Sequence, residues 1–301
     1  PPSPSFPSPD PPAWPVRPPA IPNRLVEAAD FGVVPGRIRT DSRPGLQGAL
    51  DACAASGGGL VRVAAGDYFL DGPLHLRSRV RLHLEDRAYL RFGFRPDAYL
   101  PGPPAVGGGV LVRWEGTLLY NYSPMLYARE ATDLALTGGG TLDGQGDAGW
   151  RGFRDRQAED RIRAMAMNEA DTPLVRRVFG RGCFLRPQLV SFVDCERVWI
   201  EGPTFADAGF WVVHPVFCRD VTIRRVRFDC PGINSDGIDP DSCQSVLVED
   251  VAFGNGDDNL AIKSGRDAEG LRLGRPSERI HVRRCHFSGL TGFAIGSEVA
   301  G

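Results

Sequence analysis

Three aspartates carry the strongest chemical signal in this 301-residue sequence. Asp236 lies in GINSDGIDPDSC (232–243), and Asp257 and Asp258 follow in GNGDDNLAIKSG (254–265). Carboxylates held close together raise the pKa of at least one of them, and a protonated carboxyl beside an ionised one can perform acid–base hydrolysis of a glycosidic bond. Clustered carboxylates also bind calcium, and Asp, Asn and Gly often end strands in turns without any function. The register of the aspartates decides among these interpretations.

An internal repeat supplies that register. Four nine-residue segments have apolar residues at positions two and four and Phe at position nine: RVWIEGPTF (197–205), DVTIRRVRF (220–228), SVLVEDVAF (245–253) and RIHVRRCHF (279–287). Their first apolar residues are 23, 25 and 34 positions apart. A period near 24 with short strands predicts a right-handed parallel β-helix, because one coil cannot bury its apolar face alone and must stack on the next. Asp236 and Asp257, 21 residues apart, then lie on neighbouring coils and share one outer patch.

The remaining segments fit the same architecture. Residues 40–59 are expected to form a helix that caps the N-terminal end of the solenoid and protects its edge. Residues 1–22 hold 11 of the 26 prolines and are expected to be a leader or linker, with the catalytic β-helix domain spanning 23–301. Three cysteines precede the repeats at equivalent positions and are expected to form a buried ladder of free thiols: Cys195, Cys218 and Cys243.

Composition excludes several classes of function. The chain has 35 basic and 37 acidic residues, so it has no electrostatic footprint for nucleic acid. No apolar run is long enough to span a membrane, and 42% apolar residues suffice for a core. Neither CxxC nor HExxH occurs, so the common zinc and thioredoxin-like signatures are absent.

At the aspartates the sequence resembles glycoside hydrolase family 28, the polygalacturonase family, in its bacterial form. Asn234-Ser235-Asp236 is similar to the family's NTD element, Gly256-Asp257-Asp258 matches GDD, AIKSG (261–265) continues as in bacterial members, and GFAIGSE (292–298) resembles the strand after the third element. The resemblance covers residues 28–301 and includes four upstream segments: LYNYSPMLYA (118–127), GGGTLDGQG (138–146), FLRPQLVSF (184–192) and FWVVHPVFC (210–218).

The resemblance implies a right-handed parallel β-helix that hydrolyses α-1,4-galacturonosidic bonds of pectin with inversion and without a metal. Asp257 corresponds to the general acid, and Asp236 and Asp258 correspond to the pair that holds and activates the attacking water. The expected partner is a pectic polysaccharide or oligogalacturonide, and the protein is expected to be a monomer that is secreted or periplasmic.

Two departures from the family pattern affect the site. The family's GHG element falls where this chain reads Gly289-Leu290-Thr291-Gly292, so Leu290 stands where the family has His. The family's Arg-Ile-Lys element is expected beyond residue 301, and the β-helix domain is expected to be incomplete at its C-terminus. The retained carboxylates favour an active hydrolase with an altered subsite.

Five residues are candidates for binding the anionic sugar. Lys263 supplies a cation beside the acids, and Asn234 precedes Asp236 in the same element. His214 occupies the edge one coil before Asp239, where it either faces the sugar or ends a turn, and Arg186 and Gln188 lie in a segment that resembles a family segment near the cleft.

The charged insertion 150–182 is expected to form a loop or short helices at the groove rim, where it would block one end and favour exo-action. Three alternatives remain open at this stage. The chain could hydrolyse another pectic glycan, such as rhamnogalacturonan or xylogalacturonan, or be a catalytically weakened β-helix that binds polysaccharide. Pectate lyases share the architecture but use calcium and an arginine base.

Overall fold

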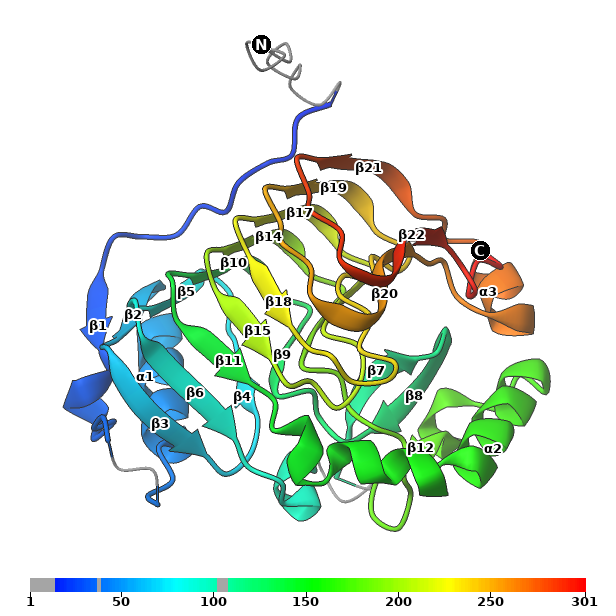
Figure 1. The fold of residues 1–301 in the computed structure, drawn as a ribbon, viewed down its shortest axis with the longest axis horizontal. Helices are drawn as coiled ribbons and strands as arrows, with labels where there is room; N and C mark the ends of the chain where they lie inside the picture. Colours follow the sequence, from blue (N-terminus) through cyan, green and yellow to red (C-terminus); the bar gives the residue numbers. More distant parts are fainter. Residues whose placement is uncertain (1–13, 37–38, 102–107) are drawn as a thin grey trace, which may run out of the picture.

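The computed structural model describes residues 14–36, 39–101 and 108–301, and its strands stack into a right-handed parallel β-helix (Figure 1). The longest sheet has the strand order β1-β2-β5-β10-β14-β17-β19-β21, with every neighbouring pair parallel. Its strands are β1 (Leu25–Glu27), β2 (Gly59–Val63), β5 (Val80–Leu84), β10 (Thr132–Thr137), β14 (Glu196–Glu201), β17 (Arg219–Arg224), β19 (Gln244–Glu249) and β21 (Glu278–Arg283).

Two further faces complete each coil. The second sheet contains β3 (Gly66–Leu70), β6 (Ala88–Phe92), β11 (Thr141–Asp143), β15 (Thr204–Ala206) and β18 (Arg227–Asp229). The third face contains β4 (Leu74–His75), β9 (Leu126–Arg129), β13 (Val190–Val193) and β16 (Val213–Val216), and it continues through β20 (Asn255–Ile262) and β22 (Gly289–Ile295). Bridges from Val213 to Ile238 and from Ile238 to Leu260 connect β16 with β20.

The register of the predicted repeat is confirmed. Val198 pairs with Val221, Val221 with Val246, and Val246 with Ile280. The phenylalanines at position nine stack through the core with ring centroids 5.0–5.3 Å apart. The cysteines of the predicted ladder are buried free thiols: Cys195, Cys218 and Cys243. Repetition of one side chain at one position thus fills the interior coil by coil.

The capping helix forms, but it is shorter than the predicted 40–59. The helix α1 (Arg43–Ala55) begins after Asp41, whose carboxylate accepts a hydrogen bond from the Arg43 backbone N–H at 2.9 Å. It ends before Gly57 and Gly58, whose φ angles of 92° and 100° do not continue a helix. Its buried side chains include the three predicted apolar residues: Leu46, Leu50 and Cys53.

The N-terminal segment runs along the solenoid (Figure 1). Residues 1–13 of the expected leader lie outside the described residues. Within the described part, the Arg17 guanidinium contacts Asp220 Oδ2 at 2.6 Å and Glu196 Oε1 at 2.5 Å, and the Ala20 backbone N–H donates to Asp133 at 2.8 Å. These contacts join the segment to several coils.

Peripheral elements gather beside the third face. The charged insertion forms short helices, as predicted: η5 (Trp150–Arg156), α2 (Ala158–Glu169) and η6 (Leu174–Arg176), followed by β12 (Val178–Phe179). An antiparallel hairpin, β7 (Val110–Trp114) and β8 (Thr117–Asn121), pairs with β12, and α3 (Asp267–Leu273) follows β20. Within the described residues, the other short helices are η1 (Ala28–Phe31), η2 (Pro96–Tyr99) and η4 (Gly146–Ala148).

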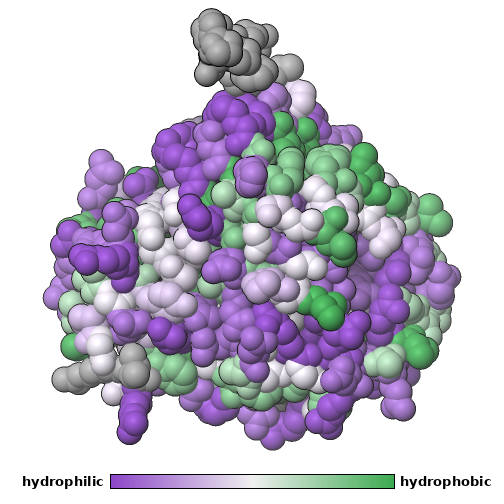
Figure 2. All heavy atoms as spheres, in the orientation of Figure 1, coloured by the Kyte–Doolittle hydropathy of each residue, from purple (hydrophilic) through white to green (hydrophobic). Residues whose placement is uncertain are grey.

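The last coil leaves apolar side chains uncovered, and Figure 2 shows hydrophobic residues gathered on that end. Leu290 and Ile295 are 79% and 72% exposed. Among the described residues, no helix has both the length and the apolar character needed to cross a membrane.

Candidate active site

A turn between two faces of one coil positions Asn234 and Asp236. The turn follows β18, and Ser235 fixes it because its hydroxyl donates to Gly232 O at 2.5 Å and accepts from the Gly256 backbone N–H at 3.1 Å. The Gly237 backbone N–H donates to Asp258 O at 2.9 Å, so Asp236 and Asp258 lie on neighbouring coils.

A local irregularity in β20 presents two consecutive aspartates to the same cavity. The pairing of β20 with β22 shifts in register between Asn255 and Asp258. The Asn255 side chain supports this segment, because its Nδ2 donates to the backbone oxygens of Asp257 and Asp258 at 3.1 and 2.8 Å. In a regular strand, successive side chains point to opposite faces, and a bulge is the usual way to redirect one of them.

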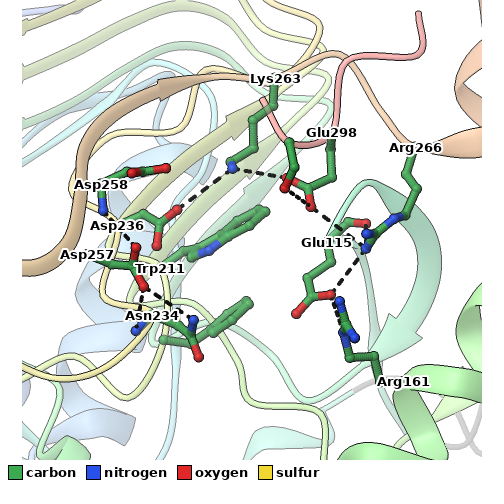
Figure 3. Close-up of a pocket in the computed structure, with 12 residues that line it drawn as sticks. Glu115, Arg161, Trp211, Asn234, Asp236, Asp257, Asp258, Lys263, Arg266 and Glu298 are labelled. Carbon is green, nitrogen blue, oxygen red and sulfur yellow. Dashed lines mark hydrogen bonds and ion pairs between the residues drawn. The ribbon is translucent and has the colours of Figure 1, made fainter. Parts of the chain in front are cut away.

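The three aspartates line one pocket of about 210 Å³ (Figure 3). Asp257 is held by three donors: the Asn234 backbone N–H and side-chain Nδ2 reach its Oδ2 at 3.2 and 3.3 Å, and the Asp258 backbone N–H reaches its Oδ1 at 3.0 Å. The predicted convergence of Asp236, Asp257 and Asp258, with Asn234 beside them, is therefore present. Their roles remain a prediction.

Lys263 is the buried counter-ion of this cluster. Its Nζ donates to Glu298 Oε2 at 3.0 Å and lies 3.7 Å from Asp236 Oδ2 and 3.8 Å from Asp239 Oδ1. The ammonium also lies 4.4 Å from the ring centroid of Trp211. Burial alone would lower the pKa of Lys263, but the surrounding carboxylates outweigh it and raise that pKa. The side chain lines the pocket, and its charge is directed toward the protein's own acids.

Burial dominates the electrostatics of Asp236. The residue is 5% exposed, and loss of water raises its pKa from 3.8 to about 7, with Lys263 opposing the rise and Asp257 and Asp258 adding to it. Asp239 lies deeper, and burial raises its pKa well above the usual value. The pocket therefore contains a carboxyl that changes protonation near neutral pH beside two further carboxyls, which is the arrangement that acid–base catalysis needs.

Three predicted sugar-binding residues lie elsewhere than expected. Arg186, Gln188 and His214 are fully buried, and none of them lines the pocket. Arg186 Nη2 donates to Asn234 Oδ1 at 2.9 Å, so it supports the turn that carries Asp236. Gln188 Nε2 lies 3.3 Å from His214 Nδ1, and burial lowers the pKa of His214.

A second hydrophobic core explains this burial. Apolar residues of the β7–β8 hairpin and of β12 pack against residues of the third face: Val112, Trp114, Leu119 and Phe179 contribute from the hairpin and β12, and Phe210 and Trp211 from the segment before β16. A strand face that would meet solvent in a bare solenoid is therefore covered. Direct contact of Arg186, Gln188 and His214 with a sugar does not fit this arrangement.

The structure adds four charged residues that the sequence interpretation had given no role: Glu115, Arg161, Arg266 and Glu298. Glu115 lies in the β7–β8 turn, and its Oε2 accepts from Arg161 Nε at 2.6 Å and from Arg266 Nη1 at 3.2 Å (Figure 3). The segment GFAIGSE signalled Glu298, because its likeness to the family extends to that residue. Nothing in the sequence signalled Glu115, because its approach depends on the fold of the hairpin.

A stack of parallel coils with a carboxylate cluster on one outer face defines a β-helix protein with an acidic pocket. A family model assigns it more closely: the chain belongs to glycosyl hydrolases family 28, whose model matches residues 119–301, more than half of the sequence.

Known proteins agree with this assignment. The chain is 29% identical over 280 residues to a probable polygalacturonase of Vitis vinifera, covering 90% of this chain and 51% of that protein. It is 26% identical over 265 residues to an endo-polygalacturonase of Pectobacterium carotovorum subsp. carotovorum, covering 85% of this chain and 58% of that protein. A crystal structure of a hyperthermoactive exopolygalacturonase from Thermotoga maritima is 40% identical with a TM-score of 0.88, covering 94% of this chain and 65% of that one. The chain thus spans about half to two thirds of the length of these proteins.

Proposed function

We propose that this protein hydrolyses α-1,4-galacturonosidic bonds of polygalacturonate by acid–base catalysis with inversion. The observation that carries the proposal is the convergence of Asp236, Asp257 and Asp258 on one pocket from neighbouring coils. Family membership and the names of the relatives support the choice of substrate.

The proposed mechanism assigns one step to each group. Asp257 acts as the general acid and gives a proton to the glycosidic oxygen as the bond to the anomeric carbon breaks. Asp236 and Asp258 hold a water on the opposite side of the sugar and take its proton as its oxygen attacks that carbon. Burial raises the pKa of Asp236 to about 7, which makes its ionised form a stronger base than an exposed aspartate. Asn234 orients Asp257 through two hydrogen bonds.

The test is the variant Asp257→Asn, assayed by release of reducing sugar from polygalacturonate. Loss of a general acid costs about 100-fold to 10,000-fold in rate. Asp229→Asn is the matched control, because Asp229 is exposed at the end of β18 and does not line the pocket. Equal activity of Asp257→Asn and the wild type would show that Asp257 is not the acid. Products that absorb ultraviolet light, together with loss of activity on calcium chelation, would indicate a lyase instead.

We further propose an exo mode of action. The α2 helix and the β7–β8 turn bring Arg161 and Glu115 to the rim of the acid pocket. We infer that these added elements narrow the groove, which favours a chain end over an uninterrupted polymer. Product analysis on a defined oligogalacturonide should show one short product released from one end, and a random mixture of internal products would contradict this mode.

The proposal also concerns location and assembly. A polymer of cell-wall size is degraded outside the cytoplasm, so we infer a secreted or periplasmic protein. We also propose that the protein acts as a monomer. Size-exclusion chromatography with light scattering tests the second point, and a stable dimer would contradict it.

A further inference from the structure

A second cavity adjoins the acid pocket. Its volume is about 500 Å³, and Glu115, Arg161 and Asn234 line both cavities. Asn234 donates to the carboxylate of Asp257, so the second cavity begins next to the proposed general acid. A sugar in the acid pocket would have its neighbour along the chain in this second cavity.

The excess of negative charge in the acid pocket is absent from the second cavity. The acid pocket is lined by five carboxylates and three cations, whereas the second cavity has two arginines and two carboxylates. Arg154 and Arg161 are the arginines of the second cavity. A sugar carboxylate is repelled by the aspartate cluster and is accommodated better beside these guanidinium groups.

Arg161 is placed to recognise an anion. Its Nε donates to Glu115 Oε2 at 2.6 Å, and the side chain remains 43% exposed. A guanidinium held at one edge keeps N–H donors on its other edge, in the fork geometry that fits a carboxylate. Glu115 itself is fixed from the other side by Arg266 at 3.2 Å. The orientation of Arg161 is therefore set before a ligand arrives.

The helix that carries Arg161 is held firmly in place. Asn168, in the same helix α2, donates through Nδ2 to Thr117 Oγ1 at 2.9 Å and accepts from the Glu269 backbone N–H at 2.9 Å. Glu269 also accepts from the Leu118 backbone N–H at 2.8 Å. These contacts join α2 to the β7–β8 hairpin and to α3, and a rigid platform of this kind suits a specificity-determining residue.

We propose that the second cavity is a subsite for a uronate sugar next to the cleaved bond, and that Arg161 binds the carboxylate of that sugar. This inference rests on the proposed function and makes it more specific. It predicts that the enzyme discriminates between a free uronate and its uncharged methyl ester at this position.

The test compares Arg161→Gln with the wild type on trigalacturonate and on its methyl-esterified form. We expect kcat/KM on trigalacturonate to fall about 10-fold to 100-fold, mainly through KM, because a hydrogen bond to a charged group is lost. Activity on the ester should change little. Arg163→Gln is the matched control, since Arg163 lies on the same helix, is 45% exposed and pairs with Asp160, but lines neither cavity.

Each outcome separates the subsite from the proposed function. A wild type that does not hydrolyse trigalacturonate overturns both. An active wild type with an unchanged Arg161→Gln, or with equal losses on acid and ester, overturns only the subsite. Arg161→Lys serves if the glutamine variant unfolds: it retains the charge without the fork, so we expect an intermediate KM, and a wild-type KM would contradict recognition by the fork.

Discussion

The substitution Asp236→Asn should increase stability at alkaline pH while removing activity. Asp236 is 5% exposed, and burial raises its pKa from 3.8 to about 7 despite Lys263 at 3.7 Å. In the unfolded chain the same carboxyl returns to its ordinary value of about 3.9. The folded protein therefore binds this proton more tightly than the unfolded chain does.

Because the folded protein binds this proton more tightly, protonation of Asp236 stabilises the fold at low pH. The stability that Asp236 contributes is complete below about pH 4 and is lost as the pH rises through about 7. For a pKa near 7, the loss in the free energy of unfolding between pH 5 and pH 8 is about 3 kcal/mol. Asparagine does not ionise, so the variant avoids this loss. Relative to the wild type, Asp236→Asn should gain about 3 kcal/mol across that range.

The assay is urea unfolding of both proteins at pH 5 and pH 8, with reducing-sugar release measured in parallel. Asp133→Asn is the control, because hydrogen bonds from Arg197 at 2.6 and 2.8 Å lower the pKa of Asp133. Because the pKa of Asp133 is lowered, its contribution to the free energy of unfolding changes with pH only below about pH 4. The stability loss in this control should therefore be the same at pH 5 and pH 8. A difference between Asp236→Asn and the wild type that stays constant with pH would refute the reasoning.

Two further predictions concern the solenoid. Gly138→Ala should destabilise the protein by about 3 kcal/mol or more, for two reasons. The new Cβ would clash with a backbone oxygen of the neighbouring coil, and the φ angle of 96° at residue 138 is strained for alanine. Gly182→Ala has a similar φ of 84° but nothing within 4 Å, so it should cost only about 1–2 kcal/mol, and equal denaturation midpoints for the two variants would contradict the steric argument. The ladder thiol Cys218 is buried and its pKa is raised, so it should resist a thiol reagent until the protein unfolds. The partly exposed Cys183 and Cys285 should react first. Labelling of Cys218 in the native protein, detected by mass spectrometry, would contradict its burial.

The stacking was predictable from sequence because a solenoid repeats its local rules. Apolar residues at fixed positions of each unit must meet those of the next unit, so the pairing of Val198 with Val221 and Val246 follows from the period alone. The same argument placed Asp236 one coil from Asp258. Helix ends were less accurate: the glycines at 57–59 mark the stop in the sequence, but α1 spans only Arg43–Ala55 of the predicted 40–59.

The environment of the aspartates was not predictable in the same way. Lys263 was expected to face the substrate, yet its nearest acceptor is Glu298, 35 residues further along the chain. Arg186 and His214 were expected at the cleft, but the β7–β8 hairpin covers the face that carries them. No local pattern encodes where a hairpin will fold back.

The sequence by itself determined the coils, their register and the meeting of three carboxyl groups, because these depend on a short period and on burial of one apolar face. The tertiary structure alone decided which charges neutralise those carboxyls, which polar residues are buried, and how Glu115 and Arg161 come to line the pocket. These features depend on contacts between segments that do not belong to the repeat, and such contacts are set by packing rather than by spacing along the chain.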